Sequence, residues 1–381
     1  MCRLRCVQPP HCCTRIRDGV FLEAVQQPVR TIAANFATEL PEAISTEAEL
    51  EENLMRPSAA LIKFIKTITS PLLVLGAGGK MGPTLAVLAR RAAEAAGQPL
   101  EVVAASRFSN AAPRQWLEAR GVRTVSADLL GATALARLPD AEYIIYLVGL
   151  KFGTAQNPAA TWAINTIVPA RVCERYPRSR IVALSTGNVY PQSEVSRGGS
   201  VETDPLTPPG EYANAAVGRE RIFEFYSRRQ GTPITLLRLF YAVELRYGVL
   251  VDIARKVHAG EPVALGNGAF NCIWQRDANE LILRALPLAA TPASVYNLCR
   301  PENFSVREVA TRFGELLGRA PLFSGSETTT ALLGNAAKLC AALGSPATSM
   351  ETVLRWTAQW VKQGGRDLGR PTHFEVRDGN Y

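Results

Sequence analysis

Three glycines spaced by two residues follow a short apolar segment, Leu72–Leu75, and precede a long run of helix-forming residues. In such a strand–turn–helix unit, glycines let the backbone approach a pyrophosphate, and the N-terminus of the helix favours its negative charge. The pattern therefore predicts a dinucleotide-binding turn at the start of a parallel sheet. The cofactor-binding residues predicted in this turn are Gly76, Gly78, Gly79, Lys80, Met81 and Gly82.

Short apolar segments continue to alternate with longer segments of helical periodicity as far as residue 240. The predicted strands are Leu72–Leu75, Leu100–Ala105, Arg123–Ser126, Tyr143–Val148, Arg180–Leu184 and Ile234–Leu239. Apolar strands alternating with helices are typical of a parallel sheet covered on both faces, which predicts an α/β, Rossmann-like, doubly wound fold. Beyond it, predicted helices at Val249–Ala259, Ala278–Ala285, Val306–Leu317 and Met350–Gln363 and strands at Pro262–Ala264 and Val295–Leu298 indicate a smaller, partly interleaved α/β substrate domain.

Four parts of the chain are expected: a disordered extension over residues 1–43, a helical lead-in over 44–69, an NAD(P)-binding domain over 70–240, and a substrate-binding subdomain with C-terminal helices over 241–381. Thr46 and Glu49 form a capping-box pattern that predicts where the first lead-in helix begins. Four cysteines and His11 crowd into the first thirteen residues. Their spacing matches no zinc-binding motif, so no metal site is predicted.

Composition narrows the class of protein. No apolar run approaches the roughly 18 to 20 residues that span a bilayer, and the remaining cysteines are scattered singly, as is usual in a reducing cytosol. The net charge is +8, but the basic residues are dispersed and accompany no nucleic-acid-binding motif. We therefore expect a cytoplasmic protein that acts on a small molecule, without a nucleic-acid or membrane partner.

The residues after the second predicted strand, Ser106 and Arg107, bear on cofactor choice. NAD-binding proteins place an acid there for the ribose hydroxyls, whereas serine and arginine suit a 2′-phosphate, so NADP is predicted over NAD. The alternative for Arg107 is a solvated loop residue, which leaves NAD open. After the third strand, Asp128 and Leu129 are predicted to meet the adenine, although Asp128 could equally cap a helix.

Several further motifs resemble those of the extended short-chain dehydrogenases, the NAD(P)-dependent epimerase/dehydratase family, over roughly residues 70 to 300. The matching residues are Gly149-Leu150-Lys151, Asn165, Leu184-Ser185-Thr186-Gly187-Asn188-Val189-Tyr190, Tyr212, Glu220, Leu237-Arg238-Leu239 and Trp274-x-x-Asp277. The resemblance implies that Tyr212 is the acid/base and that Thr186 orients the substrate oxygen. It also implies that Val148, Gly149, Lys151, Asn165 and Tyr212 adjoin the cofactor.

The family's Tyr-x-x-x-Lys helix is broken here, because Ala216 replaces the lysine that in the family holds the cofactor ribose and lowers the tyrosine pKa. Lys151, from the loop after the fourth strand, is the predicted stand-in, unless it is only a surface lysine. Arg219 lies on the same helical face as Tyr212, but seven residues on, or about 10 Å along the axis. That separation predicts no direct contact between them.

Polar residues that could bind substrate are Asn188, Glu244, Arg246 and Asn271, with Glu211 and His373 as further candidates. Glu244 and Arg246 could instead pair with each other, and His373 could simply be exposed. The leading expectation is an oxidoreductase or epimerase/dehydratase that transfers hydride to or from a sugar or sugar acid, with or without an attached nucleotide. The alternative is a non-catalytic NADP-binding sensor. Apolar residues in the segment Arg221–Ser227 suit either a homodimer contact or packing on the sheet.

Overall fold

The computed structural model describes residues 40–68, 71–150, 157–369, 372 and 374–377. All of these residues belong to one compact unit, Thr38–Tyr381. Most of the predicted N-terminal extension, with its cysteines and His11, lies outside the described residues, as do Lys151 and His373.

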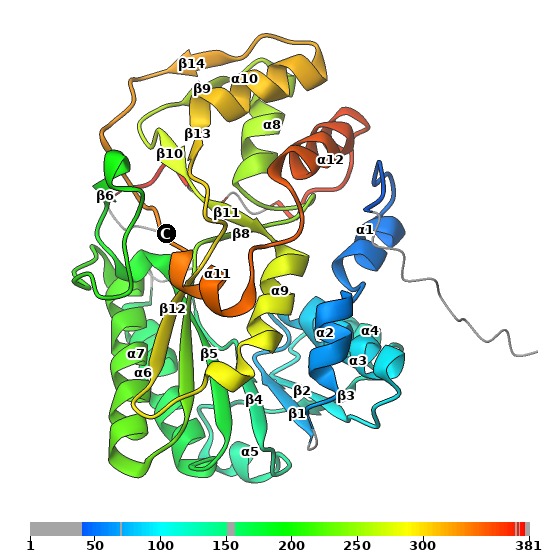
Figure 1. Cartoon of the computed structure of the whole chain (residues 1–381), viewed down its shortest axis with the longest axis vertical. Helices are drawn as coiled ribbons and strands as arrows, with labels where there is room; N and C mark the ends of the chain where they lie inside the picture. The colour runs from blue at the N-terminus through cyan, green and yellow to red at the C-terminus, as the bar shows by residue number, and fades with distance from the viewer. Residues whose placement is uncertain (1–39, 69–70, 151–156, 370–371, 373, 378–381) are drawn as a thin grey trace, which may run out of the picture. The chain divides into compact units, whose positions relative to one another are not determined.

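A seven-stranded parallel sheet in the order β12-β7-β5-β4-β1-β2-β3 forms the centre of this unit (Figure 1). Its strands are β1 (Leu72–Leu75), β2 (Val102–Ser106), β3 (Arg123–Ser126), β4 (Tyr143–Tyr146), β5 (Arg180–Thr186), β7 (Ile234–Leu239) and β12 (Ser294–Leu298). All six strands predicted before residue 240 are confirmed, with small shifts at their ends. The strand predicted at Val295–Leu298 within the smaller domain is β12, which pairs with β7 at the edge of the central sheet.

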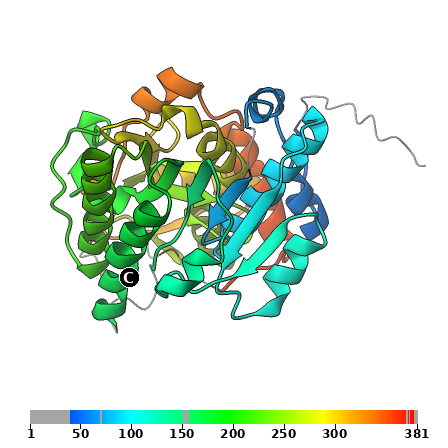
Figure 2. The same cartoon turned by 90° about the horizontal axis from the view of Figure 1, so that it is seen from below.

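Helices cover both faces of the sheet (Figure 2). Leu72 and Val74 of β1 share one core cluster with α2 (Ala59–Ile65), α3 (Gly82–Ala96), α4 (Ala111–Glu118) and α9 (Gln275–Arg284). Leu73 and Leu75 point to the opposite face, where they share a cluster with α5 (Ala132–Ala136), α6 (Pro158–Arg175) and α7 (Glu211–Gln230). Because successive strand residues face opposite sides, apolar strands need both layers, and the predicted doubly wound fold is confirmed.

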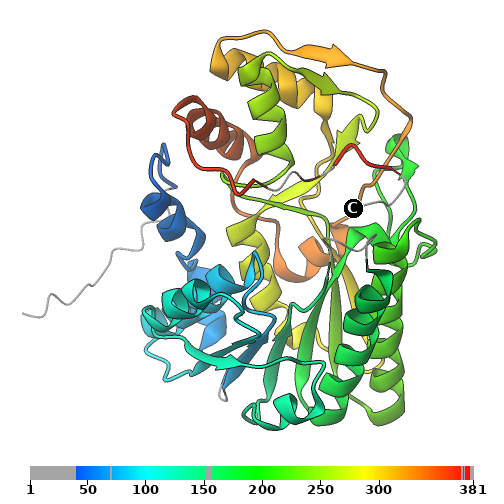
Figure 3. The same cartoon turned by 180° about the vertical axis from the view of Figure 1, so that it is seen from behind.

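A second hydrophobic core is formed mainly by the helices that follow β8 in the chain (Figures 1 and 3). There α8 (Val249–Ala259), α10 (Val306–Leu317) and α12 (Met350–Lys362) pack together around Trp356, and α1 (Glu47–Leu54) adds Leu50 and Leu54. Thr46 and Glu49 form the predicted capping box at the start of α1. The remaining smaller elements of the described chain are β6 (Ser193–Glu194), β8 (Tyr241–Val243), β9 (Pro262–Ala264), β10 (Ala269–Phe270), β11 (Cys272–Trp274), β13 (Phe304–Ser305), β14 (Leu322–Ser324), β15 (Thr330–Ala331) and α11 (Ala337–Leu343), of which α11 packs against β12.

Three further observations concern only the described part of the chain. None of its helices combines the length and the apolar character that crossing a membrane requires. No group of three or more His, Cys, Asp or Glu side chains there is placed to hold a metal ion. Cys173, Cys272 and Cys299 are buried free thiols, and Cys340 is a partly buried one.

Candidate functional site

Two cavities open at the carboxyl ends of the parallel strands. The first, of about 290 Å³, adjoins the ends of β1, β2 and β3, and the second, of about 350 Å³, adjoins the end of β5 and the start of α7. Gly76, Gly79, Leu147 and Gly149 line both cavities. The two cavities therefore meet at the glycine turn, at the edge of the sheet where open α/β folds bind their ligands.

The glycine turn requires three of its glycines for steric reasons. Gly76 has a φ of +81°, and a Cβ placed on it would lie 2.9 Å from the backbone of Leu147 and Val148. A Cβ on Gly78 would lie 2.7 Å from Ser106 Oγ, and one on Gly82 would lie 2.6 Å from the backbone of Ala77. Gly82 begins α3, whose first turn has no side-chain cap. The turn thus fits a pyrophosphate, with backbone N–H groups available to an anion.

The first cavity collects the residues predicted for the adenosine half of a dinucleotide. Ser106, Arg107, Asp128 and Leu129 all line it, together with the predicted Val148 and Gly149. Asp128 Oδ1 accepts a hydrogen bond of 3.1 Å from the N–H of Leu130, and α5 begins after Gly131, so Asp128 closes a turn and does not cap that helix. Asp128 supplies the one carboxylate in the described lining of this cavity, and Arg107 is exposed at its edge.

The second cavity brings together Thr186, Asn188 and Tyr212, which come from separate elements. Thr186 ends β5, and its hydroxyl donates to Asn188 Oδ1 at 3.0 Å while accepting from the Asn188 N–H at 3.2 Å. Tyr212 lies in the first turn of α7 with 7 % of its surface exposed. Lys80 reaches the same cavity, where its Nζ donates to the Ala242 carbonyl at 2.9 Å. A hydroxyl and a phenol thus face a space large enough for a small ligand.

Arg219, which was not predicted as a site residue, also lines the second cavity. Its Nη1 donates to the Val148 carbonyl at 3.1 Å and to Asn165 Oδ1 at 3.2 Å, which also fixes the predicted Asn165. Helical side chains lean towards the N-terminus, so a long side chain two turns after Tyr212 reaches back along the same face. The rise per residue gives only the distance between backbone positions. An arginine seven residues after Tyr212 was the sequence signal that could have identified this residue.

The position of the missing lysine has a different environment. Ala216 is fully buried and belongs to an apolar cluster with Val189, Tyr190 and Phe240. A lysine at this position would leave its aliphatic stem and charge among apolar groups, which is unfavourable without a partner. Arg219 and Lys80 supply the positive charge in the described lining of the second cavity.

Three of the four predicted substrate residues do not line either described cavity. Glu244 pairs with Arg246 at 3.2 Å, as the alternative interpretation held, and Arg246 also contacts Glu47 at 3.2 Å. Asn271 is buried. Its side-chain amide donates to the Gly334 carbonyl and accepts from the Gly334 N–H. Asn188 is the predicted substrate residue that lines the second cavity.

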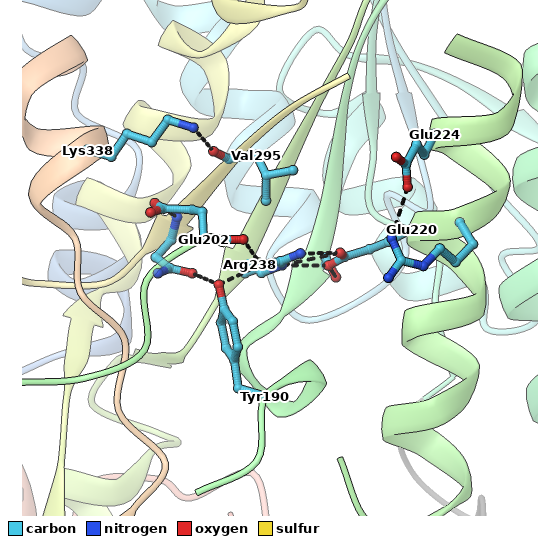
Figure 4. Close-up of polar contacts among 10 residues, drawn as sticks. Tyr190, Glu202, Glu220, Glu224, Arg238, Val295 and Lys338 are labelled. Carbon is cyan, nitrogen blue, oxygen red and sulfur yellow. Dashed lines mark hydrogen bonds and ion pairs between the residues drawn. The ribbon is translucent and has the colours of Figure 1, made fainter. Parts of the chain in front are cut away.

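A buried polar network of Arg238, Glu220 and Tyr190 (Figure 4) supports the end of β5, which Ser185 and Thr186 form. Arg238 donates to Glu220 through Nε and Nη2 at 3.0 and 2.7 Å, and its Nη1 donates to Tyr190 Oη at 2.6 Å. Ser185 Oγ donates to Glu220 Oε1 at 2.5 Å. Burial is the main cause that raises the pKa of Tyr190 to about 12. The network joins α7, β5 and β7 and so fixes the backbone from which Thr186 projects.

Comparisons with known proteins agree with this architecture. Residues 72–299 match the model of the NAD dependent epimerase/dehydratase family. Similar solved structures include the UDP-glucuronic acid 4-epimerase of Bacillus cereus in complex with NAD (18 % identity, TM-score 0.64) and the dTDP-glucose 4,6-dehydratase of Streptomyces venezuelae with NAD and TYD bound (20 %, 0.63). Each alignment covers 77 % of this chain and 96 or 97 % of the other.

A third similar structure is the UDP-glucose 4-epimerase of Thermotoga maritima with UDP-glucose, with 19 % identity, a TM-score of 0.61 and coverage of 77 % of this chain and 99 % of that chain. At these identities the structures establish the shared fold, whereas the family match extends over more than half of the sequence. No curated protein matches the chain. On the family match and the geometry of the site, the chain belongs to the NAD dependent epimerase/dehydratase family, a family of enzymes.

Proposed function

We propose that this protein binds a nicotinamide dinucleotide, NADP in preference to NAD, and uses it in an oxidoreductase or epimerase/dehydratase reaction on a sugar or sugar acid. One observation carries the proposal: Thr186 and Tyr212 line a cavity that meets the glycine-turn cavity at shared residues. A binding protein needs the turn but has no need of a hydroxyl and a phenol facing the adjoining space.

The first cavity is where the adenosine half of the cofactor would bind. Gly76, Gly78, Gly79 and Gly82 would face the pyrophosphate, and Asp128 with Leu129 would meet the adenine. Ser106 and Arg107, at the end of β2, would bind a 2′-phosphate, for which an arginine fork is well suited. Two of the similar structures contain NAD, which supports a nicotinamide dinucleotide in general and leaves the choice of NADP to this chain's own residues.

The bound nicotinamide ring supplies an acceptor or donor of hydride. In the oxidising direction, a C–H bond and the O–H bond of the same substrate carbinol break, and a C=O double bond forms. The hydride would go to an oxidised nicotinamide ring, and the hydroxyl proton would pass to the Tyr212 oxygen, which must be an ionised phenolate to accept it. Thr186 holds the substrate oxygen by a hydrogen bond, and the reverse steps reduce a carbonyl. The resemblance to the family implies these roles, and the shared place of the two side chains in the second cavity supports them.

The substrate class rests on fewer residues. Asn188 lines the second cavity beside Thr186 and offers an amide to a substrate hydroxyl. Glu244, Arg246 and Asn271 are engaged with other groups, so we give them no part in substrate binding. The similar structures include enzymes of UDP- and dTDP-linked sugars, which supports a sugar ring and keeps nucleotide-linked sugars in the class to be tested.

We also propose that Lys151 supplies a positive charge to the nicotinamide half of the cofactor. The residue follows Gly149 and Leu150 directly, and Gly149 lines both cavities. A Lys151→Ala variant should lose turnover if this proposal holds. Full turnover in that variant would remove Lys151 from the site.

The direct test begins with the purified protein. Denaturing it and analysing the released small molecules by mass spectrometry shows which nucleotide and which sugar accompany it, and titrations with NADPH and NADH give the two affinities. Sugars and sugar acids, free and nucleotide-linked, are then tested for net hydride transfer by nicotinamide absorbance and for epimerisation by NMR of the product. Binding of neither cofactor would overturn the proposal. Tight NADPH binding without turnover on any substrate would favour the sensor.

A further inference from the structure

We infer that Arg219 acts in the second cavity as the cation that binds oxygen atoms of the dinucleotide and stabilises negative charge on the Tyr212 oxygen during proton transfer. The inference rests on the proposed function and adds to it a residue that sequence reasoning had set aside. It assigns to one guanidinium both cofactor binding and the pH dependence of the reaction.

The position of the guanidinium is the first support. Its Nη1 donates to the carbonyl of Val148 at 3.1 Å, in the chain that leaves β4 between the two cavities. A Cβ on Gly149 would lie only 2.7 Å from this Nη1, so the loop and the arginine are packed in direct contact. Since Gly149 lines both cavities, the charge lies where the first cavity meets the second.

The incomplete pairing of Arg219 is the second support. The residue is 4 % exposed, and within the described ranges no carboxylate forms an ion pair with it. Asn165 and Val148 supply neutral acceptors to Nη1, while Nε is buried and finds no acceptor among the described residues. A buried charge with few partners is unfavourable, and a ligand that brings hydroxyl or phosphate oxygens into the cavity removes that cost.

The neighbouring residue shows that this arrangement is specific. Glu220 follows Arg219 directly, yet its carboxylate turns away and pairs with Arg238 at 2.7 Å in the buried network. The one acid beside Arg219 in sequence is thus held by another arginine. Glu220 therefore does not neutralise the charge of Arg219. Arg219 and Tyr212 lie on the same face of α7 and line the same cavity.

The experiment compares wild type with Arg219→Gln and Arg219→Lys. The matched control is Arg221→Gln, which removes an exposed arginine of the same helix. NADPH affinity is measured by titration, and turnover is measured across pH. We expect Arg219→Gln to weaken NADPH binding by about 10-fold or more and to move the rise of turnover to higher pH by about one unit. Arg219→Lys should bring the pH profile back towards wild type, and Arg221→Gln should change neither quantity.

The outcomes separate this inference from the proposed function. If wild type binds neither cofactor, the proposed function fails and this inference fails with it. If wild type binds NADPH and turns over while Arg219→Gln shows the same affinity and the same pH profile, the inference is overturned and the function stands. If the glutamine variant does not fold, Arg219→Met decides, because it removes the charge and leaves an apolar side chain at this buried position. Weaker NADPH binding in this variant supports the inference, and unchanged binding overturns it.

Discussion

Side chains reach the second cavity by three local routes. Thr186 projects from the end of a strand, Tyr212 from the first turn of a helix, and Arg219 from two turns further along that helix. Two structural rules govern these routes: parallel strands present their carboxyl ends at one edge, and helical side chains lean towards the N-terminus. The directions in which strand ends and helical side chains project therefore shape the site as much as the residue types do.

Replacing Tyr212 by Phe removes the group that exchanges the proton and leaves the ring in place. We expect turnover to fall by about 10² to 10⁴-fold with NADPH affinity retained, because general acid–base catalysis contributes on this order. Steady-state kinetics and cofactor titration measure the two quantities. Tyr226→Phe is the control on the same helix, where the phenol donates to Glu174 far from the cavity lining. Near-normal turnover of Tyr212→Phe would remove the tyrosine from the mechanism.

Replacing Arg107 by Ala tests cofactor choice. We expect the affinity for NADPH to fall by about 10- to 100-fold, because a hydrogen bond to a charged phosphate is lost, while NADH affinity stays nearly constant. Isothermal titration with both nucleotides measures the difference. Arg114→Ala, which removes an exposed arginine paired with Glu118, is the control. Equal loss for both nucleotides would contradict a 2′-phosphate contact at Arg107.

At this scale the sequence predicts residues whose place follows from the backbone path. The glycine turn, Ser106, Asp128, Thr186 and Tyr212 lie at strand ends or helix starts, and all of them line the cavities. Arg219 was considered only as a contact of Tyr212, whereas the structure places its guanidinium against Val148 and Asn165 beside the second cavity. Glu244 and Arg246 follow β8 near the site, but two oppositely charged neighbours satisfy each other, and a sequence cannot show which partner a charge will take.

Among elements, α7 has the largest share in the site, because it carries Tyr212, Arg219 and Glu220 within its first half. Glu220 ties the helix to β7 through Arg238 (Figure 4) and to β5 through Ser185. The side chains of Glu220 and Arg238 are 3 and 5 % exposed, so the pair lies in a region of low polarity. The register between helix and strands is thus fixed by polar groups close to the cavity.

Replacing Arg238 by Met leaves Glu220 buried without its cation. We expect the free energy of unfolding to fall by about 3 to 5 kcal/mol, because removing one partner of a buried pair leaves an uncompensated charge. Urea denaturation measures the change. Arg221→Met breaks an exposed pair with Glu224 and should cost less than about 1 kcal/mol. A similar small change for both variants would mean that the buried pair contributes little to folding.

The element predictions differ in quality for a physical reason. Helices at Val249–Ala259 and Val306–Leu317 match the prediction because their apolar periodicity spans several turns. Two-residue strands such as β6 and β15 are too short to carry any period, and they were missed. For β12, periodicity identified a strand but contains no information on which sheet the strand joins.

At the scale of the whole molecule, separate core clusters lie around the central sheet and around α8, α10 and α12. A ligand that binds only the native state stabilises it by RT ln(1 + L/Kd), where L is the ligand concentration, so the stabilisation grows with the logarithm of that concentration. We expect NADP⁺ at 100 times its Kd to stabilise the protein by about 2.7 kcal/mol, visible as a rise in Tm by calorimetry. NAD⁺ at the same concentration should give a smaller rise. An equal rise with both nucleotides would contradict the proposed preference.

Apolar side chains on α6 and α7 bear on the predicted homodimer. Phe223 packs inward against Tyr146, while Phe225 is 48 % exposed and Trp162 of α6 is 39 % exposed. We expect a dimer in solution that uses this face, and Phe225→Glu should shift it to monomer, since a charge at a buried interface is unfavourable. Light scattering after size exclusion measures the mass. A wild-type monomer at all concentrations would contradict the prediction.

The place of β12 has a consequence for how the chain is made. Ribosomes deliver β7, which ends at Leu239, well before β12, which begins at Ser294, and the whole segment that bears α8 and α9 emerges between them. Until then the nascent sheet exposes the backbone of β7 as an unpaired edge, a template for pairing with other chains. Synthesis must therefore pass residue 298 before β12 can pair with β7 and complete this edge of the central sheet.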